Sequence, residues 1–389
     1  MAERDALEAA AAAGVISAEQ VGPLHDFLAS QSAGISARPG GEEDLRFIRN
    51  FHDVFLAIGI LLLAVGLSIA VTVIAATSGQ PDAQSGVLTS GALFAGCAAI
   101  MWLLGEVFAR RRRLFLPAIA IVCSLTVFMV MATALLYAGA MVGRGFDGPA
   151  WDLSQMPQEL RVGILAALAF SFMAPFAFYL RFRLPFSLGL SGFGLAFFVI
   201  VAALIANFEL ATDWLPVLFL VLGMLLFSAG VAFDARDPAR TTRFSDNGFW
   251  LHFAAAPLIL NGAFGVIGMI FGTRVGLAAV VGTDGGAAAT PQAMLTLAVV
   301  VLLGFISLLI NRRVLIVSTL ITTGAAIGVL MNAAGLGAGA LAASTLIVLG
   351  AFVLILGASW HSARRALLGW VKPEGLLARV FPPEAPAAA

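Results

Sequence analysis

The sequence predicts an all-α fold, a polytopic bundle of transmembrane helices, and its composition gives the first reason. Of the 389 residues, 60% are hydrophobic and 11% are charged, whereas a soluble domain carries about 25% charged residues. A soluble globule of this composition would expose large apolar patches and aggregate. The repeated long apolar stretches are the second reason, because a chain in lipid must satisfy its backbone hydrogen bonds within helices or a closed barrel. Short alternating strands typical of a barrel do not occur.

Ten stretches are long and apolar enough to cross a bilayer, for which about 20 mostly apolar residues are needed. Together they form a predicted membrane domain over residues 46–360. The predicted spans are 53–76, 86–108, 114–138, 162–180, 186–206, 214–233, 249–271, 292–310, 314–331 and 339–359.

The distribution of basic residues is the third reason, and it predicts the topology. With the N-terminus in the cytoplasm, all but three of the 22 lysines and arginines fall in cytoplasmic segments, as the positive-inside rule requires. The exceptions are Arg144, Arg161 and Arg274. Removing one helix would invert every later loop and destroy this agreement. We therefore expect about ten spans with both termini in the cytoplasm.

Residues 1–45 are predicted to form a small cytosolic helical module with a linker. Their first residues are acidic where a signal peptide would be basic. Gly14 is typical of a helix end, and Ser17 with Gln20 forms a capping-box pattern for a second helix that Pro23 shortens or kinks. The linker covers 30–41. Such a module is too small for its own core, so it docks on the membrane domain or on a cytosolic protein partner.

Residues 361–389 are predicted to form a basic amphipathic juxtamembrane segment that contacts the anionic lipid leaflet, followed by a disordered tail. Tryptophan and arginine near span ends are typical of anchors at the membrane interface. The predicted interface anchors are Trp250, Trp360, Trp370, Arg364 and Arg365.

Several functional classes are disfavoured by what the sequence lacks. No basic stripe suggests a nucleic-acid partner. The two cysteines, Cys97 and Cys123, lie in apolar stretches and are expected to be small buried side chains. No cluster of metal ligands, phosphate-binding glycine loop or HExxH motif occurs, and no loop is long enough for a soluble catalytic domain. We therefore expect no metal and no cofactor, and we favour a protein that is not an enzyme.

Four ionisable residues are predicted at the cytoplasmic membrane boundary: His52, Asp53, Glu106 and His252. Asp53 and Glu106 are the two acids placed within spans, and neither is central, which disfavours a pump with a mid-membrane carboxylate. The four residues could form a pH-sensitive gate, since histidine titrates near neutral pH. The favoured alternative is structural: Glu106 pairs with Arg110 one helical turn later, and Asp53 stabilises a helix N-terminus.

The predicted span 249–271 contains the least ordinary residues. Pro257 should kink it, and Asn261 is an amide near its centre. Gly262 and Gly265 allow close helix approach. One interpretation is a discontinuous helix that lines a cavity for a small-molecule ligand. The favoured alternative is a packed helix whose asparagine bonds a neighbour.

Three segments carry a resemblance to a known group of proteins. Residues 13–20, 46–53 and 249–257 are similar to those of a bacterial family of predicted multispan membrane proteins of unknown function, whose members open with a short cytosolic helical module. The resemblance implies a multi-pass protein of the bacterial cytoplasmic (inner) membrane. It supplies no activity and no functional residues.

Two functions remain open on the sequence. One is a transporter or permease for a small neutral or amphiphilic molecule, slightly favoured because ten spans form two sets of five, as in transporters built from inverted repeats. The other is a non-catalytic membrane scaffold or sensor that acts through its N-terminal module. The two sets of five show no sequence similarity, so the first idea rests on analogy of fold.

Overall fold

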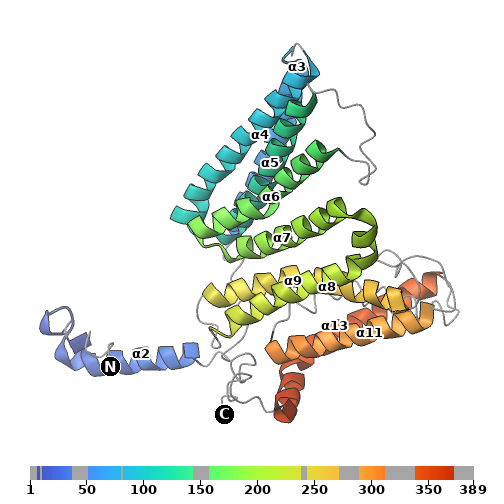
Figure 1. The fold of residues 1–389 in the computed structure, drawn as a ribbon. Coiled ribbons are helices and arrows are strands. Elements are labelled where there is room, and N and C mark those ends of the chain that lie inside the picture. Colours follow the sequence, from blue (N-terminus) through green and yellow to red (C-terminus); the bar gives the residue numbers. More distant parts are fainter. Residues whose placement is uncertain are drawn as a thin grey trace.

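The computed structural model describes residues 7–8, 11–36, 51–79, 82–142, 157–237, 243–270, 289–311 and 338–371. Within these ranges, every regular element is a helix (Figure 1). The helices are α2 (Ala18–Ser36), α3 (Phe51–Thr77), α4 (Ala83–Gly105), the π-helical turn η1 (Glu106–Arg111), α5 (Phe115–Val142), α6 (Gln158–Phe182), α7 (Pro185–Ala206), α8 (Phe208–Asp234), α9 (Arg243–Ile270), α11 (Ala289–Ile310) and α13 (Ala338–Val371).

Seven of these helices are long and apolar enough to cross a membrane. They have 22 to 29 residues and mean hydropathies of 1.9 to 2.9, and they cover the first seven predicted spans. They are α3, α4 continued by η1, and α5 to α9. This confirms the helical class and is compatible with an integral membrane protein. The helices α11 and α13 cover the spans predicted at 292–310 and 339–359, whereas 314–331 lies outside the described residues.

The N-terminal helix α2 begins as the capping pattern predicts. The backbone N–H of Ser17 donates to Oε1 of Gln20 at 3.0 Å, and Gly14 has a φ of 71°. The helix then continues through Pro23 to Ser36, which is further than expected. Proline removes one backbone hydrogen bond but leaves the remaining ladder intact. The predicted linker at 30–41 is therefore helical in its first part.

The membrane-length helices pack mainly against their neighbours in the chain. Figure 1 shows α3 to α6 side by side, followed by α7 and then by the α8–α9 pair. The first group encloses an apolar core that includes Met101, Ile121, Phe128 and Phe178. Figure 1 also shows α2 away from these helices.

The helix α9 is the most buried of the seven. Of its most apolar stretch 61% is buried, against 11–44% in the other six, because α9 packs on α7, α8 and α11. Glycines bring the backbones of α8 and α9 together: a Cβ added to Gly223 would lie 2.7 Å from the backbone nitrogen of Ile259. Gly262 and Gly265 of α9 in turn meet Leu220 and Pro216 of α8, so the predicted close approach is confirmed.

Candidate functional site

The candidate site is a buried histidine–aspartate pair between the two most closely packed helices. Nε2 of His252, in α9, lies 3.2 Å from Oδ2 of Asp234, the last residue of α8. His252 is 0% exposed and Asp234 is 5% exposed. Both residues belong to membrane-length helices, where ionisable side chains are costly and are usually kept for function.

The residues around the His252–Asp234 pair are closely packed. A Cβ added to Gly230, one turn before Asp234 in α8, would lie 2.8 Å from the imidazole ring of His252. A Cβ added to Gly248, one turn before His252 in α9, would overlap the Asp234 carboxylate. The ring of Phe227 lies 4.8 Å from the His252 ring, centroid to centroid. Two glycines and a phenylalanine therefore hold the pair in contact and away from solvent.

The chemistry open to the pair is proton binding and release. A protonated imidazole makes an ion pair with the carboxylate, whereas a neutral imidazole makes a hydrogen bond to it. A buried histidine–aspartate contact between two helices can thus change the strength of their association when its protonation changes.

The sequence prediction found His252 but missed Asp234. The predicted span ended at Phe233, whereas α8 ends at Asp234, and the helix also contains Glu209 and Asp213 in its first two turns. The membrane-length helices of the structure therefore contain acids besides Asp53 and Glu106. An available signal was the glycine spacing, since Gly230 and Gly248 each precede a member of the pair by one turn.

Further polar groups are buried near the start of α9. Asp237, Ser245 and Asn247 are all less than one-tenth exposed. Nδ2 of Asn247 donates to the hydroxyl of Tyr179 in α6 at 3.0 Å. The Asn247–Tyr179 bond thus joins the start of α9 to α6.

The predicted anchor Trp250 packs among aromatic rings at the same end of the bundle. Its ring centroid lies 6.4 Å from that of Phe115 in α5 and 4.8 Å from that of Phe186 in α7. Phe249 and Phe253 of its own helix also contact it. Trp250 therefore joins three helices beside the His252–Asp234 pair.

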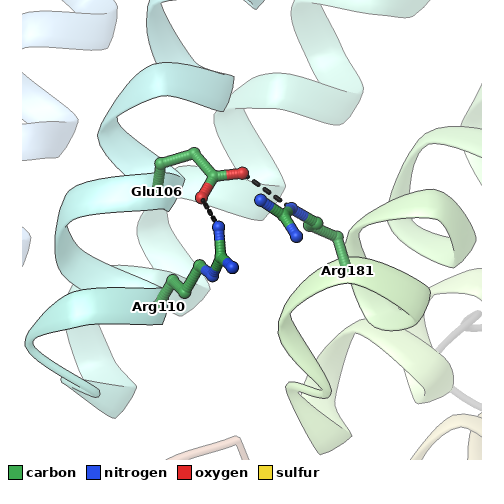
Figure 2. Close-up of polar contacts among 3 residues, drawn as sticks. All are labelled: Glu106, Arg110 and Arg181. Atoms are coloured by element: carbon green, nitrogen blue, oxygen red, sulfur yellow. Dashed lines mark hydrogen bonds and ion pairs between the residues drawn. The ribbon is translucent and has the colours of Figure 1, made fainter.

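Glu106 forms a separate, partly exposed network. Its carboxylate accepts from Arg110 at 3.1 Å and from Nε of Arg181, in α6, at 2.7 Å (Figure 2). The predicted Glu106–Arg110 pair is confirmed, and Arg181 is an additional partner from 75 residues away. On α3, His52 is exposed and Asp53 is buried. The four predicted boundary residues therefore lie at three places: α3, the contact of η1 with α6, and the contact of α8 with α9.

The structure gives the predicted cavity residues a local role. Nδ2 of Asn261 donates to the carbonyl oxygen of Pro257 at 2.8 Å, within the same helix. The helix α9 is continuous through Pro257, so the interpretation as a discontinuous helix is wrong.

The remaining predicted anchors lie on α13. Nε1 of Trp360 donates to Oδ1 of Asn311 at 3.0 Å, and Nε of Arg364 donates to the carbonyl of Leu308 at 3.1 Å. Trp360 and Arg364 are each 2% exposed and dock on the end of α11, whereas Arg365 is exposed. Trp370 is within α13, and its side chain lies outside the described residues.

Comparison with known proteins gives no assignment for this site. No family model matches the chain, and no curated protein or solved structure matches it. Within the described residues, no group of three histidine, cysteine or acidic side chains could hold a metal ion.

Proposed function

We propose that this chain is a permease-like protein that moves a small neutral or amphiphilic molecule across the bacterial cytoplasmic membrane, with the His252–Asp234 pair as its gate. The proposal includes ten spans, cytoplasmic termini, and membership of the family that residues 13–20, 46–53 and 249–257 resemble. The observation that carries it is the burial of an ionisable pair between membrane-length helices. Such residues typically mark substrate or ion pathways.

A gate needs two arrangements of packed helices and a contact that favours one of them. The His252–Asp234 contact joins α8 to α9 at the end that the basic residues assign to the cytoplasm. Protonation changes the charge state of this contact, so it can bias the two arrangements differently at different pH.

A point of flexibility lies next to the pair. Pro257 is five residues from His252 and cannot donate a backbone hydrogen bond to the preceding turn. Helices bend at such positions. Movement of the segment before Pro257 would separate His252 from Asp234 and leave the remainder of α9 packed on α8.

A ligand screen by thermal shift tests the proposal. The purified full chain is heated in detergent with small neutral and amphiphilic molecules, and a ligand at 100 times its Kd should add about 2.7 kcal/mol of stability. A hit should be transported in proteoliposomes and should weaken in His252→Gln and in Asn261→Leu. The matched control is Leu225→Ala, an exposed position in α8. A hit that His252→Gln and Asn261→Leu bind and transport like the wild type would contradict the proposal.

The second candidate, a scaffold or sensor, is favoured by one feature of α2. Phe27 is 58% exposed on this helix, and Val15 just before it is also exposed. Exposed apolar side chains on a cytosolic helix suit a protein partner. Deletion of residues 1–40 separates the candidates, because a scaffold loses its cellular activity while a permease keeps its uptake in proteoliposomes.

A further inference from the structure

Six arginines gather where α4, α5 and α6 meet at one end of the bundle. The π-helical turn η1 and the residues after it supply four, and the end of α6 supplies two. The ion pair between Glu106 and Arg181 joins the two sets (Figure 2). The side chains are all exposed: Arg110, Arg111, Arg112, Arg113, Arg181 and Arg183.

The cluster has a large excess of positive charge. Within the described part of the chain, Glu106 is the one carboxylate that contacts it, and Arg110 and Arg181 already bind both of its oxygens. Asp53 is on α3, which packs on α4 and α5, but its side chain is buried. The other arginines are exposed, and the guanidinium groups of Arg112 and Arg183 lie 5.8 Å from the ring centroids of Phe108 and Tyr179.

The position of the cluster is suited to contact with a lipid surface. It lies at the ends of three membrane-length helices, which is the level of the phospholipid headgroups. Exposed apolar side chains adjoin it on the same helices: Leu103 in α4 is 64% exposed and Leu180 in α6 is 54% exposed. A phosphate held by the arginines would have its acyl chains beside these leucines.

The backbone is unusual at the same place. The helix α4 ends in the wide turn η1, where the N–H of Arg112 donates to the carbonyl of Val107 at 3.1 Å. Turns of this kind are rare and occur frequently at functional sites. Here the turn carries Glu106, Arg110 and Arg111 from the apolar helix into the cluster.

We propose that this arginine cluster binds the phosphate headgroup of an anionic phospholipid. Guanidinium groups match phosphate oxygens with paired hydrogen bonds, and basic pockets between membrane helices are known to bind anionic headgroups. Leu103 and Leu180 favour a lipid over free phosphate, because a soluble anion would gain nothing from them. The proposal goes beyond the transport function and does not depend on it.

Binding of fluorescent phosphatidylglycerol to the full chain in uncharged detergent tests this site. The comparison lipid is phosphatidylcholine with the same acyl chains. The double variant R111Q/R112Q should bind phosphatidylglycerol about 25-fold more weakly, since each arginine near an anionic headgroup contributes roughly a fivefold factor. The matched control compares single variants: Arg236→Gln removes an exposed arginine elsewhere, whereas Arg111→Gln should weaken binding about fivefold. R111K/R112K should recover part of the affinity, because lysine keeps the charge without the paired geometry.

Equal affinity of the wild type for the two lipids would overturn the proposal. Equal losses in Arg111→Gln and Arg236→Gln would also overturn it, because the effect would then be one of total charge. Displacement of the lipid by millimolar inorganic phosphate would assign the cluster to a soluble anion. Thermal unfolding in phosphatidylcholine checks that the variants fold. If R111Q/R112Q does not fold, the single variant Arg111→Gln should weaken phosphatidylglycerol binding about fivefold. An unchanged affinity in that variant would again overturn the proposal.

Discussion

Two carboxylates at the same end of the bundle have opposite surroundings. Asp234 is buried and contacts His252 between α8 and α9. Glu106 keeps 28% of its side chain exposed and binds two arginines between η1 and α6 (Figure 2). The contact of Glu106 with Arg181, at 2.7 Å, is shorter than the contact of Asp234 with His252, at 3.2 Å.

We infer that burial, more than the contact distance, decides what each group can do. Exposed ion pairs add little stability because water and salt screen them. A buried polar group without its partner loses its solvation and its hydrogen bond together. The Asp234 site is therefore suited to a switch between two packings, whereas the arginines around Glu106 are suited to binding an anion from outside.

The largest effect is expected for Asp234→Ala. It leaves His252 buried without this carboxylate. The free energy of unfolding should fall by about 3 kcal/mol, because loss of a partner costs a buried neutral group up to about 3 kcal/mol and a buried charged group at least about that much. Denaturant or thermal unfolding of the purified chain in detergent measures this. Glu106→Ala is the matched variant at the exposed site. If it reduces stability as much as Asp234→Ala does, burial is not the deciding difference.

A slightly smaller loss is expected for Gly230→Ala. The added methyl group would lie 2.8 Å from the His252 ring, and overpacking of this kind typically costs about 1–3 kcal/mol. Gly96→Ala is the control, because a Cβ at Gly96 in α4 meets nothing within 4 Å. That variant should gain up to about 1 kcal/mol from helix propensity. A loss of stability in Gly96→Ala, or none in Gly230→Ala, would show that the site is not closely packed.

The sequence predicted the helices well and the contacts between them poorly. Span prediction depends on local length and hydropathy, which is why the first seven spans coincide with helices of the structure. The ion pair of Glu106 with Arg181 joins residues 75 positions apart, and no spacing rule predicts it. The burial of Arg364 depends in the same way on the docking of α13 against α11.

The boundary of one helix explains the missed member of the candidate site. Hydropathy fades over several residues at a span end, so a prediction that stops at Phe233 instead of Asp234 is within its ordinary error. That single residue is the partner of His252. His252 was found because its own neighbours are apolar, whereas Asp234 is followed by Arg236 and Asp237 and therefore resembles a loop.

A modest effect is expected for Arg181→Gln, which removes the cross-helix partner of Glu106. Since both side chains are partly exposed, the melting temperature should fall only slightly, and the fall should shrink further at high salt. Thermal unfolding at low and high ionic strength measures this. His252→Gln is the comparison at the buried site, where salt should change the loss little. A salt-independent loss in Arg181→Gln would mean that the Glu106 network is effectively buried.

The smallest effect concerns Asp82, a third carboxylate, which is fully exposed at the N-terminus of α4. The hydroxyl of Ser85 and, second, its backbone N–H at 2.8 Å donate to the side chain and lower the pKa of Asp82 below its ordinary value. A lowered pKa in the folded state stabilises the fold above the ordinary pKa, near 3.9, and this contribution disappears as pH falls through the lowered value. Asp82→Ala should therefore melt slightly below the wild type near neutral pH, and the two should converge as pH falls below the lowered pKa of Asp82. Ser85→Ala, which removes the larger cause, should give a smaller loss with the same pH dependence. A loss in Asp82→Ala that is constant across this range would mean that the aspartate acts through packing and not through its charge.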